Sequence, residues 1–337
     1  MSKATVLAGY CAIALCALLL AAEAAAQEAP IILRVEATDW VLYVNDVTNP
    51  SQVGRTAGPV AVNAGTRASN FYGSFALADV ASINDSPAKG VFVATGQQLF
   101  LSPSPTPTQA VGDITRTTYF HTAFEFLKPD GSPIGSIFGS GMFPGAPPPG
   151  SPVGAETGNM TIVGGTGAFI GARGTINNIG CFGCRFASQA EDPSMRRING
   201  GGRQQTLIQF FPVFRPEVVI GTSGATIFHN DYSLVTTSSP ARAGETLIVY
   251  AKGLGPTTPN INPGDLFPSE PLAIATSPVE VLVNGKSSPA INQVGVPGTP
   301  DTYRVDFRVP DDTATGMATL QLVAAWIKGG PVSIPVR

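Results

Sequence analysis

The sequence predicts an all-β protein in which a closed antiparallel β-barrel is followed by a β-sandwich. Two observations carry this prediction. The 337 residues include 38 glycines and 30 prolines, and only 13% are charged, a composition typical of many short strands and turns. Runs of β-branched and aromatic residues also recur between clusters of turn-forming residues, and no convincing amphipathic helix follows the N-terminal segment.

The N-terminal segment has the three parts of a secretory signal. Lys3 gives a positive start, Ala4–Leu20 is apolar, and Ala24-Ala25-Ala26 offers a small-residue cleavage site before Gln27. An uncleaved membrane anchor is the alternative, although the apolar stretch is short for a membrane span. We therefore expect residues 1–26 to be a signal peptide. The rest of the chain is then secreted or periplasmic, in the cell envelope, with no stable membrane insertion after cleavage.

Residues 31–214 are expected to form the barrel. Turn residues such as Asn49-Pro50 and Pro129-Asp130-Gly131 separate about nine runs of strand-forming residues. Short strands at hairpin spacing favour closure, because a closed barrel has no exposed sheet edge. The expected strands are Ile31–Asn45, Pro59–Asn63, Asn70–Asp79, Gly90–Leu101, Thr117–Leu127, Ile134–Phe143, Asn159–Val163, Ala168–Asn177 and Thr206–Phe211. The proline-rich stretch Phe143–Pro152 is interpreted as an exposed loop.

Residues 218–337 are expected to form the sandwich. The boundary between the domains lies within Ser188–Glu217, which holds a run of three glycines and two prolines that flank a short strand. Beyond it, short alternating strands separated by proline, glycine and asparagine fit a β-sandwich. The expected strands include Thr246–Ala251, Val279–Val283, Tyr303–Val309, Ala318–Val323 and Pro331–Val336.

The glycine-rich segment Gly158–Ile176 (GNMTIVGGTGAFIGARGTI) allows two interpretations. A dinucleotide-binding turn would need a helix directly after the glycines and an acidic residue about 20 positions further on. The following residues, Ala172–Gly180, are rich in glycine, asparagine and β-branched residues, which form helices poorly. Two barrel strands joined by a tight turn are therefore favoured, and no cofactor is expected.

Within that segment, Ile162–Gly174 resembles the signature of the dirigent and allene oxide cyclase-like barrels. Leu42–Asp46 resembles the first strand of that family, with Asn45 in place of a histidine, and Phe71–Pro87 resembles its acidic third strand and following turn. The resemblance implies an eight-stranded antiparallel barrel with an internal pocket for a small apolar or phenolic ligand. It also implies a homo-oligomer, since many members are trimers, and an isomerase, cyclase or coupling-guide activity without a metal or nucleotide.

The second domain resembles the Ig-like, IPT/TIG-type modules at the C-terminal end of bacterial secreted proteins. The segments that carry this resemblance are Tyr250–Pro256, Val281–Gly285 and Tyr303–Pro310. It implies an Ig-like sandwich with a surface or spacer role.

Asp46 and Arg173 are the first candidate catalytic residues, because both match positions of the dirigent-like barrels. In those pockets an aspartate and an arginine handle the oxygen of a phenol or quinone methide. A buried carboxylate beside an arginine can exchange a proton or stabilise an oxyanion. A plain salt bridge at one end of the barrel is the open alternative. Tyr43 and Asp79 are the candidate ligand-binding residues.

His121 is the third candidate catalytic residue, as the only histidine of the predicted barrel. Histidine titrates near neutral pH, so it could serve as a weak general base. Strand alternation divides Thr117–Leu127 into an aromatic face, which must be buried, and a polar face that carries His121. The polar face is interpreted as solvated, and an inward-facing pocket wall is the alternative. The aromatic face comprises Phe120, Thr122, Phe124 and Phe126, and the polar face Tyr119, His121, Ala123 and Glu125.

Cys181 and Cys184 are expected to form a disulfide, the default for a cysteine pair in an exported chain. A redox motif would need a helix N-terminus, and a zinc site would need two further ligands. The only histidines, His121 and His229, fall in different predicted domains, so no metal is expected. A net charge of -3 without a basic block argues against nucleic acid as a partner.

Two functions remain open from the sequence. One is an exported barrel that binds an apolar or phenolic small molecule and acts as an isomerase, a cyclase or a coupling guide. The other is a non-enzymatic structural or adhesion protein of the envelope or the secreted fraction, with the barrel as its scaffold.

Overall fold

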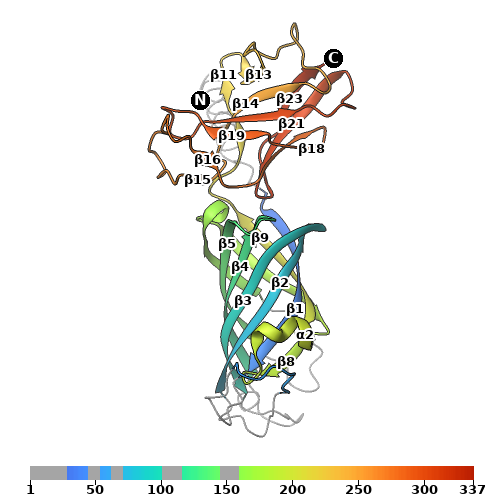
Figure 1. Ribbon diagram of the computed structural model, residues 1–337, viewed down its shortest axis with the longest axis vertical. Coiled ribbons are helices and arrows are strands. Elements are labelled where there is room, and N and C mark those ends of the chain that lie inside the picture. Colours follow the sequence, from blue (N-terminus) through green and yellow to red (C-terminus); the bar gives the residue numbers. More distant parts are fainter. Residues whose placement is uncertain (1–28, 45–53, 62–70, 101–115, 145–158) are drawn as a thin grey trace, which may run out of the picture. The chain divides into compact units, whose positions relative to one another are not determined.

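Eight antiparallel strands close into a β-barrel, as the sequence predicts (Figure 1). The computed structural model describes residues 29–44, 54–61, 71–100, 116–144 and 159–337. Around the barrel the order is β1, β2, β3, β4, β5, β6, β7 and β9, and β9 pairs back with β1. The strands are β1 (Ile31–Val44), β2 (Phe71–Ile83), β3 (Ser86–Phe100), β4 (Arg116–Leu127), β5 (Pro133–Pro144), β6 (Asn159–Gly165), β7 (Arg173–Phe182) and β9 (Gly202–Phe211).

Several of the expected strand positions differ from the structure. The expected strand Ala168–Asn177 begins only at Arg173, because Gly167–Phe169 forms a 3-10 turn. Residues 59–61 lie outside any strand, so the expected run Pro59–Asn63 is not a barrel strand over its described part. The last barrel strand, β9, begins at Gly202, four residues before the expected start at Thr206. The additional strand β8 (Arg185–Ser188) pairs in parallel with Val41–Val44 at the end of β1.

The turn between β2 and β3 illustrates how local sequence sets the hairpins. Asn84 and Asp85 both have positive φ, at 50° and 64°. A two-residue turn of this kind matches the twist of antiparallel strands, and asparagine and aspartate tolerate the left-handed conformation better than other non-glycine residues. The two strands pair from Phe71 with Leu99 to Ile83 with Ser86.

A bulge in β1 changes which side chains face the interior. Asp39 has a φ of 55°. From Thr38 to Val41 the register advances three residues along β1, whereas the paired strand β2 advances only two, from Asp79 to Leu77. Before the bulge, Leu33, Val35 and Ala37 belong to the barrel core, and after it Leu42 and Val44 do. The extra residue therefore reverses the alternation, which is how a bulge redirects a strand.

The second domain is built from sandwich-like sheets around a separate apolar core. One sheet has the order β10, β14, β20, β19, β16 and β15, with β13 also paired to β14, and the other has the order β18, β17, β21 and β22, with β23 also paired to β21. The first sheet contains β10 (Glu217–Val218), β13 (Ile227–His229), β14 (Thr246–Lys252), β15 (Thr257–Thr258), β16 (Ile274–Ala275), β19 (Asn292–Gly295) and β20 (Tyr303–Arg308). The second contains β17 (Val279–Val283), β18 (Lys286–Pro289), β21 (Gly316–Ala324), β22 (Ile327–Lys328) and β23 (Val332–Val336), and the hairpin β11 (Ile220–Gly221) and β12 (Gly224–Ala225) is separate.

One hairpin turn of the second domain belongs to the core of the barrel. Residues Ile31–Arg337 form one compact unit, and within it Ala325 and Ile327, each at most 2% exposed, cluster with the buried barrel residues. The Trp326 ring lies 5.7 Å from Phe126 and stacks on Phe169 at 6.5 Å. The β21–β22 turn therefore covers the aromatic part of the barrel core.

Candidate functional site

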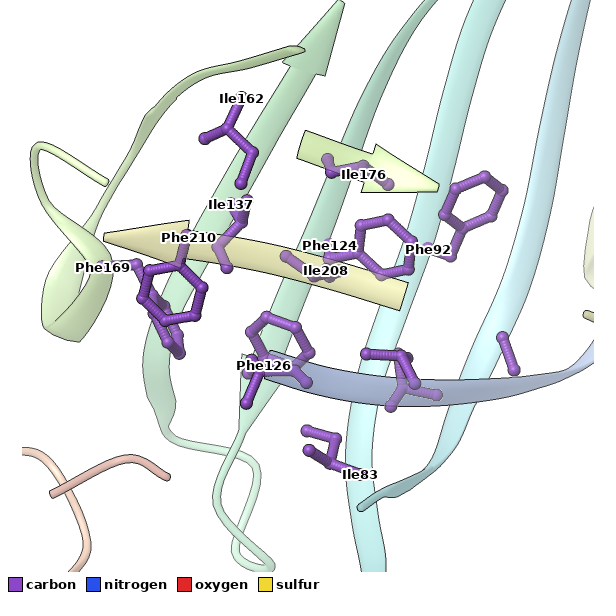
Figure 2. Close-up of a cluster of buried hydrophobic side chains, with 14 of the residues drawn as sticks. Ile83, Phe92, Phe124, Phe126, Ile137, Ile162, Phe169, Ile176, Ile208 and Phe210 are labelled. Carbon is purple, nitrogen blue, oxygen red and sulfur yellow. The ribbon is translucent and has the colours of Figure 1, made fainter. Parts of the chain in front are cut away.

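The barrel interior has two chemically different halves. The half nearest the start of β1 is filled by aromatic and aliphatic side chains, which Figure 2 shows pointing into one shared space. Phe169 lies edge to face against both Phe126 and Phe210, at 5.3 and 5.8 Å between ring centroids. Further along, Phe124 packs against Phe92 at 4.9 Å. This half is a packed core.

The half of the interior nearest the end of β1 combines apolar side chains, such as Leu42 and Val44, with small and polar ones. Strand pairing puts them on successive rungs, since Asn178 pairs with Thr206, Gln204 pairs with Ala37, and Gly202 pairs with Trp40. Gln204 and Thr206 are only 6% and 3% exposed. This polar half of the interior includes Trp40, Ala76, Ala94, Thr122, Asn178, Gln204 and Thr206.

Three buried polar atoms in this polar half have no hydrogen-bond partner among the described residues. They are the indole Nε1 of Trp40 and the amide oxygens of Asn178 and Gln204. An indole nitrogen can only donate and an amide oxygen can only accept. Leaving such a group buried and unpaired costs roughly 1–3 kcal/mol, so these atoms call for a bound water or ligand that both accepts and donates.

The described charged residues that are buried lie on the outside of the barrel. Because of the bulge at Asp39, Tyr43 points outward, where it is 0% exposed and stacks on Phe75 at 4.8 Å. Its hydroxyl has no partner among the described residues. Burial, assisted by the charge of Glu191, raises the pKa of Tyr43 to about 12. The residue is therefore a neutral phenol at physiological pH.

Asp79 faces the same outer side and binds two arginines. Arg197 donates from Nε and Nη2 to the two carboxylate oxygens at 2.6 Å each, and Arg196 donates from Nη2 at 2.5 Å. Both arginines belong to the short helix α2 (Arg196–Asn199), which follows the single turn η5 (Pro193–Met195). Asp79 thus fastens this helical segment to β2, and its oxygens are already occupied.

A second ion pair fastens the same segment next to β1. Glu191 is 0% exposed and receives two hydrogen bonds from Arg185 of β8, at 2.7 and 2.6 Å. It also accepts from the backbone N–H of Val60 at 2.9 Å and from the Asn199 amide at 3.3 Å. Burial tends to raise the pKa of Glu191, but these hydrogen bonds outweigh it and lower the pKa. Such paired buried charges are characteristic of a structural clamp.

The other sequence candidates lie apart from this clamp. His121 is exposed on the outer face of β4, with its ring 4.8 Å from that of Tyr119. Arg173 is exposed at the start of β7, level with the start of β1. Asp46 lies outside the described residues. The structure therefore places Tyr43 and Asp79 on the same outer face without contact between them, since Tyr43 pairs with Phe75 and Asp79 with Thr38. Neither His121 nor Arg173 lies beside either residue.

The glycine-rich segment forms strand, turn and strand. Between β6 and β7 stands only the three-residue 3-10 turn η4 (Gly167–Phe169). Gly167 has a φ of 58°, and a Cβ there would lie 2.3 Å from the Ile134 carbonyl oxygen. At Gly174, a Cβ would lie 1.9 Å from the Gln209 carbonyl oxygen. These glycines permit close backbone contacts within the barrel wall.

Cys181 and Cys184 lie at disulfide-bonding distance, with their Cα atoms 5.6 Å apart. In the described part of the chain, no cluster of three or more histidine, cysteine or acidic side chains could hold a metal ion. None of the helices described there has the length and apolar composition to cross a membrane.

Comparison of the chain with protein-family models, with curated proteins and with solved structures gives no match. The assignment of function therefore depends on the site alone. Sequence reasoning missed Trp40, Asn178 and Gln204. Continuing the alternation of β9 back from Ile208 and Phe210 would have placed Gln204 inside, had the strand been expected to begin at Gly202.

Proposed function

We propose that the protein binds a small neutral molecule with an apolar body and a hydroxyl group inside the polar half of the barrel. The observation that carries the proposal is the unpaired set of Trp40 Nε1 and the amide oxygens of Gln204 and Asn178. A hydroxyl group accepts from the indole and donates to an amide oxygen, so it satisfies both kinds of atom.

The apolar body of this ligand would rest on the aromatic floor formed by Phe92 and Phe124. Pockets of this type are typically apolar, with a few polar groups that fix orientation. Since the buried charges of the described residues, Glu191 and Arg196, lie on the outer face, nothing there would balance a charged ligand. Neutral phenols and alcohols fit best, in keeping with the apolar or phenolic ligand that the family resemblance implies.

Binding is better supported than catalysis. General acid–base chemistry needs a titratable group within hydrogen-bond reach of the reacting atom. Of the described candidates, Tyr43, Asp79 and His121 face outward and Arg173 is exposed. The barrel would then act as a carrier or a conformational guide for a ligand, exported by the N-terminal signal. Orienting a flexible molecule is by itself a source of selectivity.

The test compares two adjacent glutamines of β9. Gln204 is buried in the interior, whereas its neighbour Gln205 is half-buried and alternates to the other face. Titration calorimetry with 2-naphthol should show binding by the wild type, and Gln204→Leu should weaken it about tenfold, the equivalent of one hydrogen bond of about 1.4 kcal/mol. Gln205→Leu should leave the affinity unchanged.

Native mass spectrometry of the protein purified from its producing cells adds a second readout. A retained neutral ligand that is lost in Gln204→Leu would support the proposal. Equal affinities in the two leucine variants, or no binding of 2-naphthol and no retained ligand, would refute it. That result would favour the alternative in which the barrel is a structural scaffold.

A further inference from the structure

A groove lies outside the barrel interior, where one end of the barrel meets the second domain. It is a groove of about 520 Å³ lined by the start of β3, by the β4–β5 turn and the strand ends beside it, by residues of β17, β18 and β21, and by Trp326. This volume falls within the range of roughly 300–1,000 Å³ found for small-molecule sites. Its apolar lining includes Leu127, Ile134, Val279, Val323 and Trp326.

Trp326 forms part of the wall of this groove. One part of its ring system packs on Phe126 and Phe169 in the barrel core, and the residue remains half-buried. The contacts behind it hold the indole in place, so that a flat apolar surface is available without a loss of side-chain freedom on binding.

The charged residues of the groove give it a positive balance. Lys89 lies near the start of β3 and Lys128 in the β4–β5 turn, and the only acidic lining residue is Glu280 on the second domain. The carboxylate of Glu280 already accepts a hydrogen bond from the Ser287 hydroxyl. Lys89 donates only a long hydrogen bond, 3.4 Å, to the Pro129 carbonyl oxygen. No hydrogen bond of the Lys128 ammonium to a described residue is found.

We propose that this groove binds an amphipathic monoanion: a molecule with one apolar chain or ring system and one carboxylate or similar anionic group. The apolar part lies along Trp326, Val279 and Val323, and the anion lies between Lys89 and Lys128. Glu280, on the opposite domain, disfavours the reverse orientation. This site is independent of the ligand proposed for the barrel interior.

Two probes with the same chain and opposite charge test the proposal on the full-length protein. Dodecanoate and dodecyltrimethylammonium are titrated by calorimetry at low ionic strength, below the concentrations at which they form micelles. Two exposed lysines should give the carboxylate an advantage of up to about thirtyfold, which is about 2 kcal/mol at 1.4 kcal/mol per factor of ten. The double variant Lys89→Glu/Lys128→Glu should invert the preference.

The matched control is Lys252→Glu/Lys286→Glu, which makes the same change in net charge at two exposed lysines outside the groove lining. It should retain the preference of the wild type. Since the chain has two tryptophans, Trp40→Phe leaves Trp326 as the only indole. Its emission should change as dodecanoate binds, which places the ligand at the groove.

Three results would overturn the proposal. One is the absence of dodecanoate binding, and another is the same carboxylate-to-cation ratio in the groove variant and the wild type. The third is binding without any change in Trp326 emission. Thermal unfolding of each variant establishes that the folded protein is being compared.

Discussion

Replacement of Trp326 by alanine should destabilise the barrel, although the residue belongs to the other domain. The indole packs against Phe126 and Phe169, with centroid distances of 5.7 and 6.5 Å. Its neighbours Ala325 and Ile327 are 1% and 2% exposed and cluster with the same barrel residues. Removing the indole therefore uncovers the aromatic end of the barrel core.

The size of the effect follows from burial. Truncating a fully buried tryptophan costs about 3–5 kcal/mol, and Trp326 is only half-buried, so we expect a loss of about 2 kcal/mol in the free energy of unfolding. With a urea m-value of about 3 kcal/mol/M, this lowers the unfolding midpoint by about 0.7 M.

Urea titration followed by far-ultraviolet circular dichroism measures that midpoint. Trp326→Phe, which keeps a ring in the contact, should recover most of the loss. Phe186→Ala, at a phenylalanine that is 59% exposed, should lie near the wild type. An unchanged midpoint in Trp326→Ala would contradict this prediction, because it would show that the turn contributes no stability to the barrel.

Two further predictions concern charge. Burial lowers the pKa of His229, but the hydrogen bond to Glu245 at 2.6 Å, the bond to the Ser239 carbonyl oxygen and the nearby carboxylate charges together outweigh it and raise the pKa. Its stabilisation is therefore complete below the unfolded-state pKa of about 6.5 and is lost as pH rises through the folded-state pKa. Unfolding titrations between about pH 6 and pH 9 should show this loss in the wild type and not in Glu245→Gln, and equal slopes would contradict it. Asp79→Asn should cost about 2 kcal/mol in the same assay, because it leaves the buried Arg196 unpaired. Asp85→Asn, which breaks an exposed pair, should cost less than about 0.5 kcal/mol, and equal losses in the two variants would contradict the clamp.

The barrel could be predicted because its strands follow simple rules. Alternation in β4 separates Phe124 and Phe126 from His121 and Glu125, and the structure buries the first pair and exposes the second. The strand–turn–strand conformation of the glycine-rich segment also follows from local sequence, since the residues after the glycines form helices poorly.

The site could not be predicted, because it depends on a bulge. Simple alternation through β1 would have turned Tyr43 inward and Trp40 outward. Asp39 in the left-handed region reverses both. Aspartate tolerates that conformation but is also common where no bulge occurs, so the sequence carries no unambiguous signal. Only the paired partners in β2 and β9 reveal the shift.

The packing of the β21–β22 turn on the barrel core could not be predicted from the sequence either. Positive φ at Ala325 and Trp326, 48° and 65°, is unfavourable for residues of this kind, and turn rules expect glycine or asparagine there. Burial of the turn against the barrel core compensates for the unfavourable backbone. Tertiary contact, and not local preference, sets this conformation.

That turn also bears on how the chain can be divided. A truncation near residue 214 would separate the two sets of sheets, but it would also remove the contacts of Trp326 with Phe126 and Phe169. A barrel fragment ending there would present an aromatic patch to water, which favours self-association. The two domains therefore depend on each other for solubility. Transferring either one to another protein would require a new contact in place of the one between the Trp326 indole and the barrel core.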